Sequence, residues 1–359
     1  MHAGRDLDLW TAATASASGL AMAIASPIWG LLGDRFGRKP MLIRSMVGGA
    51  LTVGLMYFAH SPVELLVLRF LQGATSGTVA AATALVAAET PRRRVGWALG
   101  VVTSAVALGG AIGPVVGGLA GAAFGLRLVF LGGGILLSIS TVPVLLIVRE
   151  SPRRRRDPGR MGTLDAIRQR SGAGRALSVL IGAQGLVSVA NSATQQLLVL
   201  RLLEMLTSGV SAVSGIAFGL AGVASSGAAI FYTNVTRRIG YVRTTVVAAV
   251  LIAVAVALIG VSPWVALVVG ATALNGMFSG VVIPATASMI GLETPPEAQS
   301  TIFGFNASSV AFGFFLGPLI GGGVAATAGV PAALLVIAGL AVLLAVLMAV
   351  GGREPGVQN

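Results

Sequence analysis

Polar side chains inside long apolar stretches are the first candidates for chemistry in this sequence. Arg69 and Gln72 lie in one such stretch, where the spacing of positions 69, 72, 76 and 83 predicts one polar helix face. A second stretch holds Gln184, Ser188, Asn191 and Gln195 at spacings of four, three and four, and Asn275 and Asn306 are further candidates. We expect these groups to line a buried polar cavity that takes a ligand. Two other interpretations stay open, because Arg69 could extend toward the helix end near Glu64 and the amides could join one helix to another.

The sequence contains no pattern for covalent or metal chemistry. Cysteine is absent, and His2 and His60 are far apart, so we predict no disulfide, no thiolate and no metal site. Paired carboxylates and nucleophile–base spacings are also missing, so we predict no enzyme and no cofactor. The glycines of GGAIG and GLLGDRFG resemble a dinucleotide-binding fingerprint, but that fingerprint needs a strand leading into a helix. Here they lie in or at the end of apolar helices.

The composition places these stretches in a membrane. Of the 359 residues 55% are hydrophobic and 10% charged, and the mean hydropathy is +0.90, whereas a soluble chain carries roughly 25% charge. A span needs about 20 helical residues because lipid offers no partners to the backbone. We therefore predict an all-α polytopic membrane protein with eleven spans, at 11–32, 41–60, 64–88, 97–119, 126–148, 177–200, 211–232, 244–262, 264–290, 300–323 and 331–350.

Positive charges set the expected orientation. If residues 33–40 are cytoplasmic and the sides alternate, 20 of the 24 Lys and Arg residues lie on the cytoplasmic side, as the positive-inside rule requires. The net charge of +12 then reflects topology, not nucleic-acid binding. We expect a cell-membrane protein, in the plasma or inner membrane, with its first residues outside. The Arg-rich linker at 149–176 and the tail at 351–359 are expected in the cytoplasm.

The chain repeats itself at an offset of 203 to 204 residues. AAETPRRRVGWALG at 87–100 aligns with GLETPPEAQSTIFG at 291–304, GPVVGG at 113–118 with GPLIGG at 317–322, and QGATSG at 72–77 with NGMFSG at 275–280. Four matches in one register, counting RFGRK at 35–39 with RIGYV at 238–242, predict two homologous bundles at 1–148 and 177–350. The span at 177–200 lacks a first-half counterpart, so we expect five spans in the first bundle and six in the second. The helix that should open the chain is then either genuinely absent or encoded upstream of Met1.

Three motifs resemble those of the major facilitator superfamily. GLLGDRFGRKPML (30–42) is similar to the family's signature between its second and third helices, LRFLQGATSG (68–77) to its fourth-helix motif, and ALGGAIGPVVGG (107–118) to its fifth-helix antiporter motif. Together they resemble the twelve-helix drug:proton antiporters. The segments RKPMLIRS (38–45) and VPVLLIVRESP (142–152) are similar to those of the MdtG-like multidrug efflux group. The resemblance covers nearly the whole chain. It implies the major facilitator fold and a monomeric secondary transporter that exports amphipathic small molecules in exchange for protons.

We predict a latch around the first motif. The span that ends beside Asp34 and the span that begins near Ser300 share the cytoplasmic side, so the carboxylate can meet the positive end of that helix. We expect Gly30 and Gly33 to allow close approach, and Arg35 and Arg38, flanking Gly37, to pair with Glu89. Arg237 aligns with Asp34, so the second half cannot form the same latch. Alternatively, these charges only set the topology.

The Gly-Pro motifs have no chemistry of their own. Pro114 and Pro318 bend their helices, and Gly113, Gly117, Gly118 and Gly317 allow tight packing that prevents leakage. No Asp or Glu lies deep inside a predicted span. The coupling acid therefore precedes residue 1, is Asp34, or does not exist. Two other functions stay open: uptake or efflux of metabolites or sugars, and a truncated membrane protein without transport.

Overall fold

The computed structural model describes residues 2–151, 173–295 and 298–354. Within these ranges, side chains are described from residue 17 onward, apart from those at 111, 114, 115, 118, 119, 122, 126, 173 and 211. These described residues form helices and no strand, in keeping with the predicted fold class. The helices are α1 (His2–Phe36), α2 (Arg38–Leu55), η1 (Met56–Phe58), α3 (Pro62–Thr75), α4 (Thr78–Glu89), α5 (Val95–Phe124), α6 (Leu126–Leu146), α8 (Ala173–Met205), α9 (Val210–Ile239), α10 (Tyr241–Val261), α11 (Val265–Glu293), α12 (Gln299–Ala328) and α13 (Val330–Gly351).

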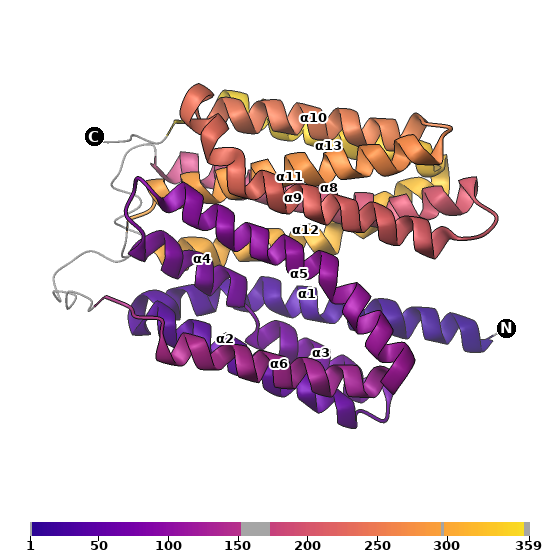
Figure 1. Cartoon of the computed structure of the whole chain (residues 1–359), viewed down its shortest axis with the longest axis horizontal. Helices are drawn as coiled ribbons and strands as arrows, with labels where there is room; N and C mark the ends of the chain where they lie inside the picture. The colour runs from indigo at the N-terminus through magenta and orange to yellow at the C-terminus, as the bar shows by residue number, and fades with distance from the viewer. Residues whose placement is uncertain (1, 152–172, 296–297, 355–359) are drawn as a thin grey trace. The chain divides into compact units, whose positions relative to one another are not determined.

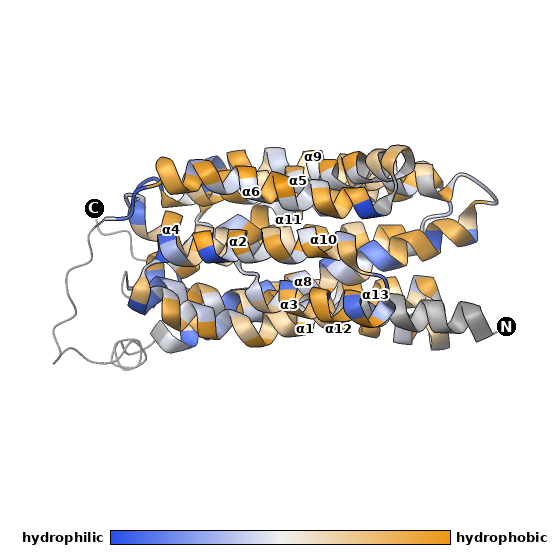
Figure 2. Cartoon of the chain, turned by 90° about the horizontal axis from the view of Figure 1, so that it is seen from below, coloured by the Kyte–Doolittle hydropathy of each residue, from blue (hydrophilic) through white to orange (hydrophobic). Residues whose placement is uncertain are grey.

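The predicted eleven spans are confirmed. Nine described segments are long and apolar enough to cross a membrane, with α3 and α4 together forming one of them at Pro62–Glu89. The other two predicted spans lie in α1 and α5, and the described part of α5 includes a shorter apolar helix at Val95–Gly110. Hydrophobic residues predominate along the helices (Figure 2). Continuous helices satisfy their own backbone hydrogen bonds, which is what the hydrocarbon requires.

The chain divides into two compact units. The first unit comprises residues 1–89, 113–163 and 296–312, and the second comprises 90–112, 164–295 and 313–359. The predicted bundles at 1–148 and 177–350 differ from these units, because the first part of α5 groups with the second unit and the first part of α12 with the first. The division into two bundles stays a prediction.

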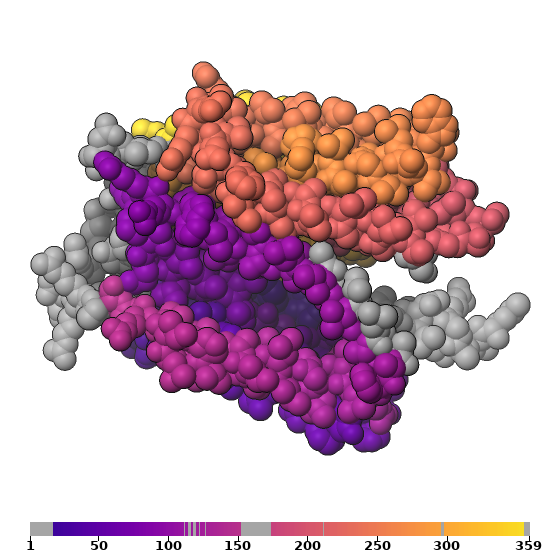
Figure 3. Space-filling model, in the orientation of Figure 1, coloured from indigo at the N-terminus to yellow at the C-terminus, as the bar shows by residue number. Residues whose placement is uncertain are grey.

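In the first unit, α1 packs on α3, and α2 packs on α4 and α6 (Figure 1). Leu42, Met46 and Leu85 form a buried apolar cluster between α2 and α4. The outer face of α6 carries large apolar side chains, among them Leu136, Ile139 and Leu146, which are 68%, 61% and 78% exposed. This helix, coloured magenta, lies on the visible surface in Figure 3. Exposed apolar side chains at this density fit a surface that faces lipid.

In the second unit, α11 packs on α9 and α10, and α13 packs on α10 and α8 (Figure 1). The side chains between these helices are mostly small or aliphatic, and Ile252, Ile259 and Leu334 are fully buried. The cores of both units therefore consist of helix–helix contacts.

One predicted helix is interrupted. The span at 64–88 consists of α3 and α4, because Gly77 has a φ of +112°, a conformation that side-chain-bearing residues rarely adopt. Arg44 donates hydrogen bonds to the carbonyls freed by the break, from Nη1 to Thr75 O at 3.2 Å and from Nη2 to Ser76 O at 3.1 Å. Its guanidinium also lies 3.6 Å from the centre of the Trp29 ring. Arg69 and Gln72 share α3, but positions 76 and 83 lie outside that helix, so the expected single polar face is wrong beyond Gln72.

Candidate functional site

Asp34 binds the first backbone amides of α12, within the first unit. Ser300 N donates to Oδ1 at 2.9 Å and Thr301 N donates to Oδ2 at 2.7 Å. Since α12 begins at Gln299, these amides belong to the first turn, whose N–H groups have no partners within the helix. The carboxylate therefore caps the helix and meets the positive end of its dipole. The geometry is the one expected of a latch, and the latch function itself stays a prediction.

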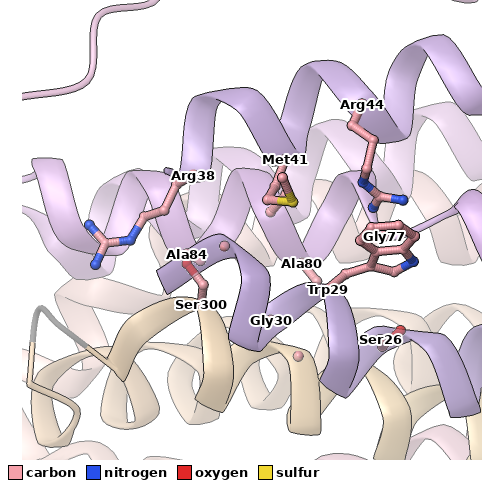
Figure 4. A pocket seen from close by; sticks show the side chains of 13 residues that line it. Ser26, Trp29, Gly30, Arg38, Met41, Arg44, Gly77, Ala80, Ala84 and Ser300 are labelled. Atoms are coloured by element: carbon pink, nitrogen blue, oxygen red, sulfur yellow. The ribbon is translucent and has the colours of Figure 1, made fainter. Parts of the chain in front are cut away.

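Two glycines of α1 bring the helices together at this point. A Cβ atom on Gly30 would lie 2.5 Å from Ser300 O, and one on Gly33 would lie 2.8 Å from Ser300 Cβ. Figure 4 shows Gly30 and Ser300 facing each other beside a cavity of about 30 Å³. The cavity is lined by Trp29, Met41, Arg38 and Arg44, among others. A volume of this size has room for water and is too small for an organic substrate.

The charged residues around Asp34 do not pair as predicted. Glu89 Oε2 accepts a hydrogen bond from Ser151 Oγ at 2.5 Å, and the described contacts of Glu89 include neither Arg35 nor Arg38. The Arg35 guanidinium lies 5.4 Å from the centre of the Phe36 ring. The expected pairing of Glu89 with Arg35 and Arg38 is therefore wrong. Arg35 contacts the Phe36 ring, and the Glu89 carboxylate binds Ser151.

A different carboxylate caps α2. Glu150 accepts hydrogen bonds from the backbone nitrogens of Arg38, at 2.9 Å, and Lys39, at 3.0 Å. Gly37 precedes them with a φ of +117°. Sequence reasoning missed this role, although the signal was present as an Arg-Glu pair that follows the last span of each predicted half.

The second half repeats this cap. Glu354 accepts hydrogen bonds from the backbone nitrogens of Tyr241 and Val242, both at 2.9 Å, beside Gly240 with a φ of +90°. Glu150 and Glu354 are 204 residues apart, so the internal repeat seen in the sequence extends to individual hydrogen bonds.

Arg69 has an uncharged environment. Its Nη1 donates to Gln72 Oε1 at 3.2 Å, and its guanidinium lies 5.8 Å from the centre of the Phe130 ring. The side chain is partly buried, and none of its described contacts is a carboxylate. An intramembrane guanidinium without a carboxylate partner retains donors for a ligand or for water.

The amides of α8 divide into two kinds. Gln184 is buried and its Nε2 donates to Ile283 O on α11 at 3.0 Å, while Ser188 Oγ donates to Gln184 O at 2.9 Å. Gln184 thus joins α8 to α11, which was the alternative interpretation, whereas the Ser188 hydroxyl binds a carbonyl of its own helix. Asn191 is half-buried and accepts from Ser279 Oγ at 3.0 Å, and Gln195 is exposed.

Asn275 and Asn306 have unsatisfied oxygens. The Oδ1 atoms of both residues are buried and have no hydrogen-bond partner in the structure, and Asn275 as a whole is only 8% exposed. An unpaired buried amide oxygen is unfavourable, so a water or a polar ligand group at either position would be stabilised. These asparagines lie on α11 in the second unit and on α12 in the first, respectively.

The two Gly-Pro motifs have different surroundings. A Cβ atom on Gly317 would lie 2.6 Å from Val189 O of α8, so α12 and α8 are in close contact near Pro318. Gly113 has open space around it, and Gly117 has its nearest neighbour at 3.9 Å, the Cγ1 atom of Val129. The side-chain positions of Pro114 and Gly118 lie outside the described residues.

Comparison with known proteins identifies the family. Residues 9–264 and 186–359 match the sequence profile of the Major Facilitator Superfamily. The chain is 31% identical over 342 residues to the multidrug resistance protein MdtG of Dickeya zeae, covering 94% of this chain and 83% of that protein. It is 29% identical over 359 residues to the MdtG of Klebsiella pneumoniae, covering 98% and 86%.

Two solved structures share the fold. The human organic anion transporter MFSD10 has a TM-score of 0.82 at 21% identity and covers 94% of this chain and 83% of its own. The fucose:proton symporter FucP of Escherichia coli has a TM-score of 0.80 at 15% identity, covering 96% and 92%. Since the profile matches extend over most of the sequence and the helices take up the same fold, this chain is a membrane transporter, not an enzyme, and belongs to the Major Facilitator Superfamily.

Proposed function

We propose that this transporter exports amphipathic small molecules by alternating access, in exchange for protons, as a monomer in the cell membrane. The observation that carries the conformational part is the pair of hydrogen bonds from α12 to Asp34, which are charge-assisted and can break and form again. The export part is supported by the similarity to relatives named multidrug resistance proteins. In this proposal the linker and the C-terminus are cytoplasmic.

The substrate site of the proposal combines polar and apolar groups. Arg69 and Gln72 would supply donors from α3, and Asn191, Gln195, Asn275 and Asn306 would supply amides. The unpaired oxygens of the last two support this assignment, because a polar ligand group or water would satisfy them. Gln184 and Ser188 would support the site through packing.

Dye accumulation in cells tests the export. Cells lacking their own drug efflux are expected to accumulate less of a fluorescent amphipathic dye when they express this chain, and a protonophore is expected to abolish the difference. The same cells should take up a labelled sugar at the rate of cells without the protein. Dye levels equal to those of cells without the protein, across cationic, anionic and neutral dyes, would contradict export. Altered sugar uptake would favour the metabolite alternative.

Arg69→Ala should lower dye efflux about tenfold, the factor expected when one ligand hydrogen bond to a charged group is lost. Initial efflux rates from preloaded cells at matched expression measure the effect. Arg127→Ala is the control, because Arg127 is exposed near the start of α6 and has the same charge. Efflux at the normal rate in Arg69→Ala would mean that the guanidinium binds no substrate and only extends toward the membrane surface.

A further inference from the structure

Serine and glycine at intervals of four bring α12 against α1 in the first unit. The α12 positions are Ser300, Gly304 and Ser308. Ser308 Oγ donates to Ala23 O at 2.5 Å, and a Cβ atom on Gly304 would lie 2.6 Å from Ser26 O. The backbones are therefore in direct contact over two helical turns, from the Asp34 cap inward.

A second contact, in the second unit, is built in the same way between α5 and α9. The α5 positions are Gly96, Gly100 and Ser104. Ser104 Oγ donates to Ser226 O at 3.0 Å, and Ser226 Oγ donates to Ser104 O at 3.3 Å. A Cβ atom on Gly100 would clash with Ala229 O.

The repeat register makes these two contacts equivalent. An offset of 204 converts positions 96, 100 and 104 of α5 into 300, 304 and 308 of α12. An offset of 203 converts Ala23 and Ser26 of α1 into Ser226 and Ala229 of α9. These are the offsets that the sequence motifs show, so the close contact itself was duplicated with the chain. Each contact joins one helix of each predicted bundle.

The two contacts differ where the helices begin. In the contact between α1 and α12, Asp34 caps the start of α12. The residue that aligns with Asp34 in the second half is Arg237, which cannot accept a hydrogen bond. In the second contact the Tyr232 hydroxyl donates to Gly96 O at 2.7 Å and shares a hydrogen bond of 2.7 Å with Ser288 Oγ on α11. Tyr232 is 1% exposed. Either oxygen of the Tyr232–Ser288 pair can be the donor, and Ser288 Oγ also donates to Pro284 O at 2.7 Å.

We propose that Tyr232 is the second-half equivalent of the Asp34 latch, a positioning residue that ties α9 to α5 in the same state in which Asp34 ties α1 to α12. The inference rests on the proposed alternating access, because opening must separate both helix pairs. The two latches use opposite backbone groups: Asp34 accepts from N–H groups at Ser300 and Thr301, and Tyr232 donates to the carbonyl of the aligned Gly96. Neutral partners form the second latch, so it holds less strongly than the charged one.

Cysteine labelling tests the second latch without a substrate. The chain has no cysteine, so Ser26→Cys on α1 and Ser226→Cys on α9 each provide a single buried reporter, at 4% and 5% exposure in the parent residues. The rate of reaction with a membrane-permeant maleimide then follows the opening of each contact. We expect Tyr232→Phe to raise both rates about fivefold, as the loss of one neutral hydrogen bond predicts.

A second tyrosine provides the control variant. Tyr57→Phe makes the same chemical change on η1, at a residue that belongs to neither contact, and should leave both rates unchanged. Combining Tyr232→Phe with Asp34→Asn should multiply their separate factors, because the two variants weaken the same state through contacts that share no residue. Unchanged labelling at both reporters in Tyr232→Phe would overturn the inference, and so would a change at position 226 alone. If Tyr232→Phe raises both labelling rates but cells that express the chain export no dye, only the proposed drug export is overturned.

Discussion

Gly304→Ala should reduce dye efflux about 100-fold, the upper range for overpacking at a contact that cannot relax. The added methyl carbon would lie 2.6 Å from Ser26 O and 3.0 Å from the Gly30 Cα atom. Both neighbours are backbone atoms of α1, so the helices must separate to make room. The variant therefore disfavours the state in which Asp34 caps α12, and a transporter that rarely occupies one of its two states turns over slowly.

Gly323→Ala is the matched control for this experiment. Gly323 lies on the same helix and has nothing within 4 Å of an added Cβ atom. Both variants gain the same helix propensity from alanine, so a difference between them reports the clash alone. The efflux rate and maleimide labelling of Ser26→Cys measure the outcome. Normal efflux together with a protected cysteine in Gly304→Ala would mean that this contact does not limit transport.

Asp34→Asn should shift the conformational balance toward the opened latch by about 30-fold, which corresponds to about 2 kcal/mol. The carboxylate oxygens accept the amide hydrogens of Ser300 and Thr301. An asparagine keeps one acceptor and turns an NH₂ group toward the other N–H, so a charge-assisted bond is replaced by a repulsion. The attraction to the dipole of α12 is lost as well. Labelling of Ser26→Cys should rise, and dye efflux should fall by a similar factor.

The control for Asp34→Asn is another change from carboxylate to amide. Glu204 is exposed and forms an ion pair with Arg201 of the same helix at 2.9 Å, and ion pairs at the surface contribute little. Glu204→Gln should therefore leave labelling and efflux unchanged. If Asp34→Asn matches Glu204→Gln in both measurements, the charges of the first motif set only the topology. A loss of efflux with unchanged labelling would instead point to a role of Asp34 in proton coupling.

Periodicity and composition predicted the helices well because they are local properties. Apolar runs of about 20 residues, counted along the chain, were sufficient to place eleven spans, and the repeat offset was visible in short motifs such as GPVVGG and GPLIGG. The same counting failed at Gly77. A break in a helix depends on the partners of the freed carbonyls, and here the partner is Arg44 on another helix.

Pairing of charges was the least predictable part of the site. Glu89 was expected to bind Arg35 and Arg38, and it binds Ser151 instead, while Glu150 caps the helix that begins at Arg38. Each carboxylate has several candidate partners on other segments of the first unit, and a rotation of one helix changes which of them is within reach.

The amino-acid sequence alone thus determined that the chain is a helical membrane protein with an internal repeat. It also predicted that Asp34 meets the start of the helix that begins near Ser300. Only the folded arrangement decided which surfaces touch. The position of Tyr232 against Gly96, the shared contact of Ser104 with Ser226 and the unpaired oxygen of Asn275 depend on distances between helices that are remote in the chain. Such distances are set by how side chains fill space between helices, which no single segment encodes.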